Sequence, residues 1–514
     1  MYKILLLASL LISSTIYAQV PEDALRYSFF PQNGTARNLA VGGAMGSLGG
    51  DINATFVNPA GLGFYKTSEF VITPGFFLNS NATKFRGTDS KNNWNSLGFG
   101  TSGWVMGFGS RYKPKISNAV SLAITQTANF NNSIKYSGLN NYSSLSEQFA
   151  EEFAKSGYSI DTVLNYNSPL PYGSAPGLYT YLIDTVKVNG LYQVKGAPEY
   201  ILDAGQALKQ EMTKTTKGGI TEFAIGFAHN SNDKWFWGVS FGIPLISYTS
   251  NTSFKESDTS ANTSNHFKQF EYTDQFKTTG VGINGRFGII YRPQDYIRLG
   301  LSVQTPTYME LSDTRTTTLS TQLENPVANF STSSTIFTND QPGESKYTQT
   351  TPFKAVLSAS YVFREVSNVK RQRAFLTADV EYVHHKGSRF GSNNDKPTDQ
   401  EKTYYKSLNK VVSADYKGSF NFRVGGELKF NTIMGRLGFA YYGDPYKDAA
   451  YKANRMLLSG GLGYRDKGFF VDLTYVYAIS KDVNFPYRLE DRANTYATLK
   501  QQRGNIVATV GVKF

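Results

Sequence analysis

The chain has 514 residues, a formal net charge of +12 and no cysteine. The missing cysteines exclude disulfides, thiol catalysis and cysteine-based metal sites. The 34 tyrosines, 36 phenylalanines and 47 glycines, with only 18% charged residues, favour a membrane β-barrel, whose strands use aromatic girdles and many glycines. Lysine and arginine are scattered and form no block, which argues against a nucleic-acid partner. The basic residues are expected either to contact anionic lipid headgroups or to line a lumen.

The first segment, residues 1–18, predicts a cleaved signal peptide. Lys3 precedes a short apolar run at residues 4–12, and small residues lead to Ala18, the expected cleavage position. The run is too short for a membrane-spanning helix, which takes about 20 apolar residues. Gln19 follows where a lipoprotein would need cysteine, so we expect export without a lipid anchor.

Residues 19–66 form the next segment, which is rich in Gly, Ala and Asn and lacks strand alternation. Its end reads Asn58-Pro59-Ala60-Gly61, a run with the chemistry of a tight turn. Because the segment precedes the first strand and has no strand pattern, we expect it to fold back into a barrel as an N-terminal hatch.

From residue 67 to 514 the chain alternates between apolar and polar residues, as strands with two different faces do. Fourteen such segments are predicted, an even number, as single-chain bacterial barrels require. Short turns alternate with long polar connections, as in barrels with short periplasmic turns and long external loops. The predicted strands are residues 67–82, 93–110, 117–136, 218–230, 235–249, 276–292, 296–309, 351–364, 373–385, 415–431, 435–443, 453–466, 468–480 and 502–514. The long connections are 137–217, 250–275, 310–350, 386–414 and 481–501.

The charged residues of the strands share the polar face. In residues 415–431, Phe420 and Phe422 alternate with Arg423. A charge on the lipid face at mid-membrane costs about 2–4 kcal/mol, so the charges are predicted to face the interior. We expect an ion-pair network there rather than a catalytic carboxylate pair. Its members are Arg286, Arg298, Arg423, Arg436, Asp379 and Glu381. A soluble β-sandwich is the alternative architecture.

The connection at 137–217 is predicted to be a long extracellular loop with helical segments. Ser144 and Glu147 form a capping box, and Leu145, Phe149 and Phe153 repeat every four residues. A second helix is expected at residues 198–212. Two interpretations stay open: the helices simply cover the barrel mouth, or Phe149 and Phe153 offer a hydrophobic landing groove for an apolar ligand.

Three further motifs have structural explanations. Gly98 to Gly103 matches GxGxxG, but the pattern stays extended, which favours a strand with a kink over a dinucleotide site. His384 and His385 are adjacent strand residues that face opposite sides, so no metal site is expected. The sequence holds no recognisable catalytic set, so no enzyme and no cofactor are predicted.

The last segment closes the chain with strict alternation. Ile506, Val510, Val512 and Phe514 share one face, and Thr509 and Lys513 lie on the other. A final strand that ends in Phe is typical of outer-membrane barrels, so we expect the barrel-assembly machinery to bind the chain through this strand. The predicted location is the bacterial outer membrane, in contact with its lipid and lipopolysaccharide.

The hatch segment carries a family resemblance. Ala36-Arg37, Gly42-Gly43-Ala44, Asp51 and Asn58-Pro59-Ala60-Gly61-Leu62 resemble the hatch of FadL/TodX-type outer-membrane transport proteins, in a Bacteroidetes-like form. The resemblance is sharp over residues 34–63 and architectural elsewhere. It implies a fourteen-stranded antiparallel barrel plugged by a hatch, with Asn58, Pro59, Ala60 and Gly61 in the hatch or gating motif.

The resemblance also implies a function. Members of that family take up long-chain fatty acids or aromatic hydrocarbons passively, through external hydrophobic loops, a lumenal pocket and a sideways exit beside a kinked strand. An acidic ligand would bind an arginine, and Arg286, Arg298 and Arg423 are the candidates inside the lumen. The alternative is a FadL-like barrel that serves a secretion system or shuttles cargo.

Overall fold

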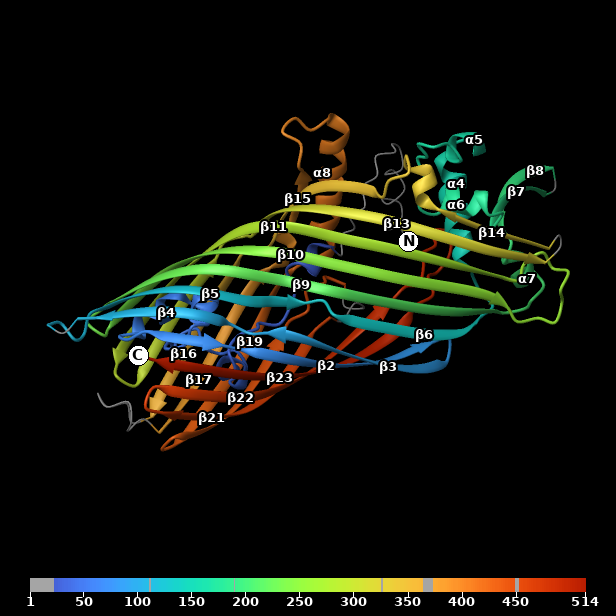
Figure 1. Ribbon diagram of the computed structural model, residues 1–514. Helices are drawn as coiled ribbons and strands as arrows, with labels where there is room; N and C mark the ends of the chain where they lie inside the picture. Colours follow the sequence, from blue (N-terminus) through green and yellow to red (C-terminus); the bar gives the residue numbers. More distant parts are fainter. Residues whose placement is uncertain (1–22, 111, 189, 325–326, 364–372, 449–452) are drawn as a thin grey trace.

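The computed structural model describes residues 23–514 apart from 111, 189, 325–326, 364–372 and 449–452 (Figure 1). The predicted signal peptide at 1–18 lies outside the described residues. The strands are β1 Glu69–Ile72, β2 Pro74–Phe85, β3 Thr88–Phe99, β4 Ser102–Gly109, β5 Ser117–Asn129, β6 Asn132–Asn140, β7 Ile183–Val188, β8 Leu191–Gly196, β9 Leu208–Ser231, β10 Trp235–Asp258, β11 Gln269–Gln294, β12 Ile297–Gln304, β13 Tyr308–Glu324, β14 Val327–Ser333, β15 Gly343–Thr350, β16 Lys354–Phe363, β17 Ala374–His384, β18 Arg389–Ser392, β19 Gly418–Phe430, β20 Ile433–Tyr442, β21 Arg455–Asp466, β22 Phe469–Asn484 and β23 Ala497–Lys513. The helices are α1 Asp23–Arg26, α2 Ala36–Ala40, α3 Ala54–Val57, α4 Leu145–Ser156, α5 Ile160–Val163, α6 Ser174–Tyr179, α7 Glu199–Asp203 and α8 Asp399–Asp415, with short 3-10 helices η1 Pro59–Phe64, η2 Ser334–Phe337 and η4 His385–Gly387.

The strands close into an antiparallel barrel of fourteen within the described residues, as the alternation predicts. Six of the fourteen are interrupted and consist of two shorter strands each: β1/β2, β3/β4, β5/β6, β12/β13, β15/β16 and β17/β18. The terminal strand β23 closes the barrel, because it pairs with β22 on one side and with β1 and β2 on the other. Phe514 and Ser68 exchange backbone hydrogen bonds of 3.0 and 3.1 Å at its end.

Large apolar side chains form an exposed band around the outside of the barrel. On β19, Phe420 and Phe422 are about half exposed, whereas the intervening Asn421 and Arg423 are buried, as predicted. The same alternation exposes Trp237, Phe241 and Ile243 on β10, Leu299 and Leu301 on β12, and Ile506, Val510, Val512 and Phe514 on the last strand. A continuous exposed apolar surface of this kind is what a lipid bilayer covers in a transmembrane barrel.

Several strands run far past this band. β10 has 24 residues and β11 has 26, so at about 3.3 Å per residue β10 alone is about 80 Å long. A hydrocarbon core about 30 Å thick covers only part of such a strand, even when it is tilted. The predicted connections at 137–217, 250–275 and 310–350 are therefore shorter in the structure, because β6, β9, β10, β11, β13, β14 and β15 continue into them.

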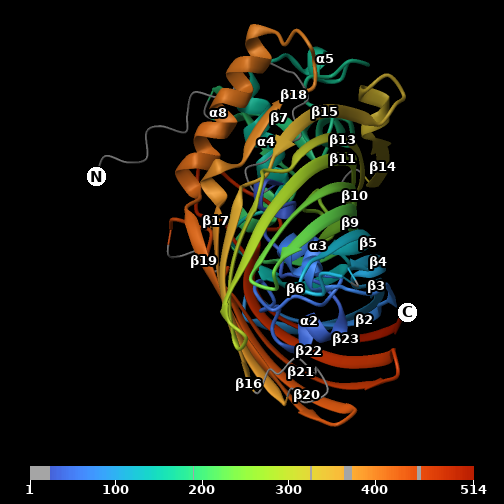
Figure 2. The ribbon, with the colours of Figure 1, turned by 90° about the vertical axis from the view of Figure 1, so that its left-hand side faces the viewer.

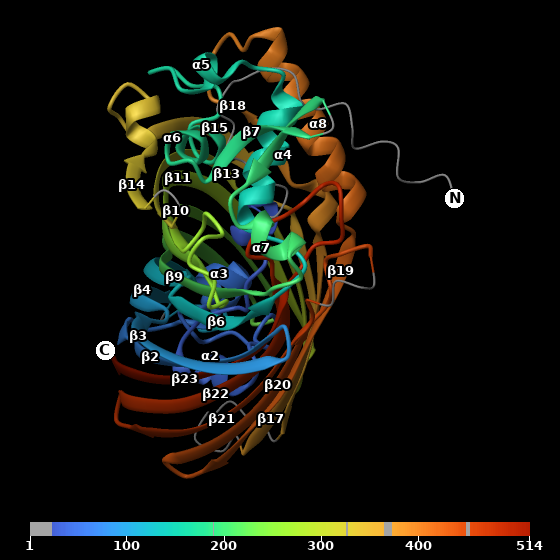
Figure 3. The ribbon, with the colours of Figure 1, turned by 90° about the vertical axis from the view of Figure 1, so that its right-hand side faces the viewer.

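Residues 23–66 lie inside the barrel and hold α1, α2, α3 and η1 (Figures 2 and 3). Their apolar residues pack against the wall in small clusters rather than in one core. Leu39 packs with Leu457 and Val507, Leu62 with Val105, and Ala60 with Ile290. The segment thus contacts strands from different parts of the barrel wall.

The end of the barrel opposite the tight turns carries the helices (Figure 1). α4, α5, α6, α7 and the small β7–β8 sheet belong to residues 141–207, and α8 stands beside them. We call the group formed by residues 141–207 the cap. In the described part of the chain, no helix is long and apolar enough to cross a membrane.

The first predicted helix is confirmed and the second is wrong in extent. α4 begins with the predicted capping box, and both of its contacts are present. The predicted helix at 198–212 is only the five residues of α7, and Leu208 and Met212 lie on β9. Both side chains are buried on one face of that strand, since their even spacing suits a strand as well as a helix. α8 was not predicted, because residues 386–414 were expected to be a polar connection.

Candidate functional site

Asn58 anchors the end of the N-terminal segment. Its side-chain amide donates to the Gly46 carbonyl at 2.6 Å, and its oxygen accepts from the Ala60 backbone N–H at 3.1 Å. The second contact caps η1, whose first residue is Pro59, a residue that suits the first helical position. The four predicted hatch residues Asn58, Pro59, Ala60 and Gly61 are all buried.

Glycines in the barrel wall make room for this turn. A Cβ on Gly288 of β11 would lie 1.9 Å from Asn58 Oδ1, and a Cβ on Gly238 of β10 would lie 2.5 Å from the Pro59 carbonyl carbon. Neither position can carry a larger residue without moving the segment. The Asn58–Gly61 turn is therefore held in a recess of the wall.

The three predicted lumenal arginines all have partners within the protein. Arg286 pairs with Glu222 at 2.8 Å, and Arg423 pairs with Glu381 at 3.3 Å. Arg298 donates to the carbonyl of Leu48 at 2.5 Å and lies over the Phe64 ring. The predicted interior ion pairs are confirmed for Arg286, Arg423 and Arg436, the last with contacts of 2.6 Å to Glu427 and 2.5 Å to Asp472.

A cavity of about 470 Å³ lies inside the barrel, between the N-terminal segment and the wall. We call it the main cavity. Its wall is mixed: apolar and aromatic side chains stand among about as many polar and charged ones, which suits a ligand with an apolar body and a polar group. The apolar and aromatic lining residues are Leu25, Phe29, Phe30, Pro31, Leu39, Phe77, Ala128, Phe130, Ile134, Tyr248, Tyr446, Ala453, Leu457, Val476, Ala478, Ile479, Val483 and Leu499.

Two arginines of this cavity differ from the predicted ones. Arg455 lies over the ring of Phe29, 4.6 Å from its centroid, and Arg503 donates to the Asn79 side-chain oxygen at 2.7 Å. Among the described residues, neither guanidinium has a carboxylate within ion-pair distance, although Asp482 also lines the cavity. They offer positive charge beside an apolar wall, which suits the carboxylate of an amphiphile.

A smaller cavity of about 120 Å³ lies next to it and is more polar, since Arg286, Glu222, Lys354 and Glu381 line it. Phe30, Gln32 and Asn33 line both cavities. This short stretch of the N-terminal segment therefore lies between the two cavities.

The barrel wall has an incomplete seam beside the main cavity. β4 pairs with β5, but β3 pairs with β2 alone and β6 with β9 alone in the part of the chain that the structure describes. Between β3 and β6, the Asn92 side chain donates to the Ser133 hydroxyl at 2.7 Å. Two side chains of β2 also contact β6: Asn81 donates to the Ser133 carbonyl at 2.5 Å, and Thr83 to the Lys135 carbonyl at 2.8 Å. Both Asn81 and Ile134 also line the main cavity, so the cavity reaches the wall at this seam.

The break between β3 and β4 falls in the GxGxxG motif, where a kinked strand is predicted. β3 ends at Phe99 and β4 begins at Ser102. A Cβ on Gly100 would lie 2.0 Å from the Gly34 carbonyl oxygen, so the N-terminal segment touches the wall backbone there. The motif serves a close backbone approach, and the strand interpretation is confirmed.

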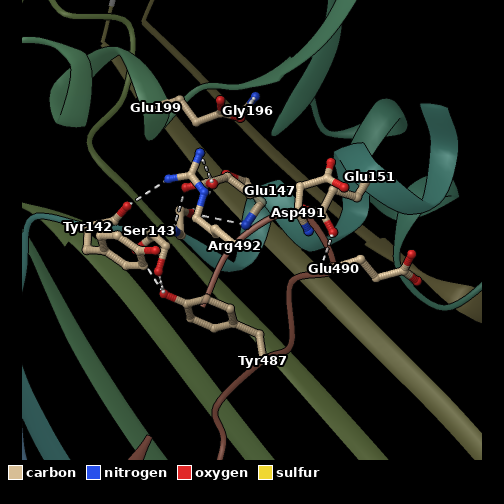
Figure 4. Close-up of polar contacts among 12 residues, drawn as sticks. Tyr142, Ser143, Glu147, Glu151, Gly196, Glu199, Tyr487, Glu490, Asp491 and Arg492 are labelled. Carbon is tan, nitrogen blue, oxygen red and sulfur yellow. Dashed lines mark hydrogen bonds and ion pairs between the residues drawn. The ribbon is translucent and has the colours of Figure 1, made fainter. Parts of the chain in front are cut away.

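The cap buries the two predicted landing residues. Phe149 and Phe153 belong to a core cluster with Leu182, Ile201 and Phe254 and are almost fully buried. α4 also holds the connection between β22 and β23 through polar contacts (Figure 4). Arg492 pairs with Glu147 at 3.1 Å, and Tyr487 donates to the Ser143 carbonyl at 2.8 Å.

The two adjacent histidines have different surroundings. His385 is buried, contacts the Ser419 hydroxyl at 3.1 Å and packs edge-on against Phe29, whereas His384 stacks on Phe353. Among the described residues, no group of three or more His, Cys, Asp or Glu is placed to hold a metal ion.

Comparison with known proteins identifies the fold. No family model and no curated protein matches the sequence. Among solved structures, the toluene transporter TodX of Pseudomonas putida aligns with a TM-score of 0.51 and 14% identity over 94% of this chain and 99% of that one. A Pseudomonas aeruginosa FadL homologue aligns with a TM-score of 0.51 and 13% identity over the same shares. The chain has the FadL/TodX-type fold.

This fold and the exposed apolar band place the chain in a bacterial outer membrane. Arg455 and Arg503 were missed in the sequence because alternation alone does not reveal which interior arginines find carboxylates. The available signal was weak: Arg503 precedes the terminal apolar alternation, and Arg455 begins a strand.

Proposed function

We propose that this protein is a passive outer-membrane channel for hydrophobic small molecules. The main cavity carries the proposal, because it combines an apolar wall with two arginines that lack carboxylate partners, beside a seam in the barrel. The fold supports it, since the toluene transporter TodX and the FadL homologue share that fold.

The preferred substrate is a long-chain fatty acid rather than a neutral aromatic hydrocarbon. Arg455 and Arg503 would bind the carboxylate, and the phenylalanines of the main cavity would contact the chain. Arg286, Arg298 and Arg423 hold the wall and the N-terminal segment together, so their role in this proposal is structural.

The route runs from the cap to the main cavity and out sideways through the seam between β3 and β6. The Asn58–Gly61 turn anchors the hatch, and the stretch at Phe30, Gln32 and Asn33 is the part that borders the route. A sideways exit releases a hydrophobic molecule into the lipid and avoids a water-filled pore.

Uptake measurements in cells that lack their own fatty-acid channel test the substrate. The protein should raise uptake of labelled oleate, and R455Q/R503Q should lower it about tenfold or more while toluene uptake stays unchanged. R492Q, which removes one charge from the connection between β22 and β23, is the control for expression and insertion. Equal loss of oleate and toluene uptake would argue against a carboxylate site. If correctly inserted wild type took up no oleate, the alternative role in secretion would be favoured.

A further inference from the structure

Four exposed lysines gather on the outer surface of four neighbouring strands, β22, β23, β2 and β3. Lys481 of β22 is the direct cross-strand partner of Lys500 of β23. Lys500 in turn faces Ala82 of β2, whose other partner is Lys91 of β3. Lys84 lies two residues further along β2. We call these four residues the lysine row.

The lysine row lacks counter-charges. None of its members has an ion pair among the described residues, and the only carboxylate in register on that outer face is Asp89, opposite Lys84. Asp482 is the neighbour of Lys481 but points the other way, into the main cavity. Like charges directly opposite on one sheet face are destabilising. A bound anion would relieve the repulsion between Lys481 and Lys500.

The row also borders a hollow in the surface. Lys84, Lys481 and Lys500 line a cavity of about 550 Å³, together with Asp89 and Asp482 and with Val483 and Leu499, two residues that it shares with the main cavity. This hollow joins three ammonium groups and two carboxylates to a partly apolar floor, which leaves it with a net positive charge. It suits a bulky anionic headgroup with an acyl chain attached better than a small free ion.

The height of the row on the barrel identifies the source of the anion. One register step toward the turns lie Ile479 and Gln502, and three steps down lie Tyr475 and Ile506 of the apolar band. A step is two residues, or about 7 Å along a tilted strand. The row therefore stands in the headgroup layer, which adds about 5–7 Å to each side of the hydrocarbon core.

We propose that Lys84, Lys91, Lys481 and Lys500 bind the phosphate groups of lipopolysaccharide in the outer leaflet. The cap end of the barrel faces outward in this proposal, as the short turns at the other end indicate. The row includes none of the main-cavity arginines, although Lys91 belongs to β3, one of the two strands that flank the seam. It holds one side of the barrel at a defined height in the leaflet.

Binding of purified full-length protein to bisphosphorylated deep-rough lipopolysaccharide tests this site. The chain is reconstituted in neutral-lipid nanodiscs with EDTA, so that no divalent cation bridges the partners. K84Q/K91Q/K481Q/K500Q should weaken binding about tenfold or more. The matched control removes the same charge from exposed lysines of β9, β11 and β15, K209Q/K217Q/K277Q/K346Q, and should bind within about twofold of wild type.

The ligand arms separate the sources of phosphate. Enzymatically dephosphorylated lipopolysaccharide should bind wild type as weakly as intact lipopolysaccharide binds the row variant, and inorganic phosphate at the same concentration should not compete. Competition by inorganic phosphate at that concentration, or equal loss in both quadruple variants, would overturn the proposal. Oleate uptake by the row variant should stay at the wild-type level, so a failure here is separate from a failure of the transport proposal.

Discussion

At the scale of single residues, the interior arginines divide into two kinds. Arg286, Arg423 and Arg436 are buried and paired with carboxylates, whereas Arg455 and Arg503 line the main cavity without such partners. Removing one member of a buried pair leaves the other charge buried without a partner. Removing a charge that has no partner leaves no such unpaired charge behind.

The two kinds of arginine should respond oppositely to the same substitution. R286M leaves Glu222 buried and unpaired, so we expect the free energy of unfolding to fall by about 3–5 kcal/mol. R455M should leave that free energy unchanged or raise it. Urea unfolding in detergent measures both, and E222Q/R286M should recover much of the loss. Equal destabilisation by R286M and R455M would contradict this division.

Sequence alternation predicts much at this scale, but it has a clear limit. It correctly places Arg286, Arg298 and Arg423 inside, because a lipid-facing charge is costly. It does not reveal that Glu222 of β9 pairs with Arg286 of β11, on the other side of β10. That pair depends on the register of the three strands. Which interior arginines lack a carboxylate partner, and are therefore available to a ligand, can be identified only once such pairs are known.

At the scale of elements, α4 connects the cap to the last loop of the barrel through Glu147. Burial raises the pKa of Glu147 to about 7. The positive charge of Arg492 opposes this rise, and the negative charges of Glu199 and Glu151 add to it. Its capping-box contact with the Ser144 N–H at 2.9 Å persists in a neutral glutamine.

The cap should therefore loosen as pH rises. A carboxyl group whose folded pKa lies above its unfolded value of 4.5 contributes most below pH 4.5, and the contribution falls between pH 4.5 and 7. We expect the opening free energy of α4, from amide hydrogen exchange, to drop by about 1–3 kcal/mol from pH 5 to pH 8. E147Q should reduce this drop, whereas E490Q, in the same loop contact but exposed, should not.

The seam between β3 and β6 makes a second prediction for an element. The Asn92 side-chain nitrogen lies 2.7 Å from the Ser133 hydroxyl, so N92C/S133C should form a disulfide in a chain without other cysteines. The oxidised pair should lower oleate uptake about tenfold, and reduction should restore it. T249C/K217C, which bridges the ordinary ladder of β9 and β10, is the control. If the oxidised variant still took up oleate at the full rate, the seam would not be the exit.

The helices show why some elements escaped prediction. α8 carries a capping box, Thr398 with Glu401, and buries Tyr405, Leu408 and Val412 at helical spacing. These signals were present in the sequence but were surrounded by polar residues. The strands were easier, since fourteen segments with period two agree with one another and with the export signal.

At the scale of the whole molecule, the N-terminal segment and the barrel are tightly joined. Barrel glycines approach its backbone at Gly238, Gly300, Gly425 and Gly438, and Gly288 approaches the side chain of Asn58. Ser47 and Ser360 also share a hydroxyl contact of 2.6 Å between the segment and β16. Under the proposed function, a segment with so many close contacts is expected to stay in place while a ligand passes beside it.

A crosslink tests whether the hatch must leave. S47C/S360C replaces two touching hydroxyls by thiols, and its oxidised form joins the segment to the wall. We expect oleate uptake within about twofold of the reduced form. A loss of tenfold or more that reduction reverses would show that this part of the hatch has to move. Single-cysteine variants control for the substitutions themselves.

The strands that run past the apolar band lift the mouth of the barrel above the bilayer. Under the proposed function, a ligand would leave the surrounding water at that raised rim and reach lipid at a lower level, through the wall. The two ends of the route would then open into different solvents. The gain on passing from water to hydrocarbon, about 0.8 kcal/mol for each methylene, would set the direction of flow without any coupled energy source.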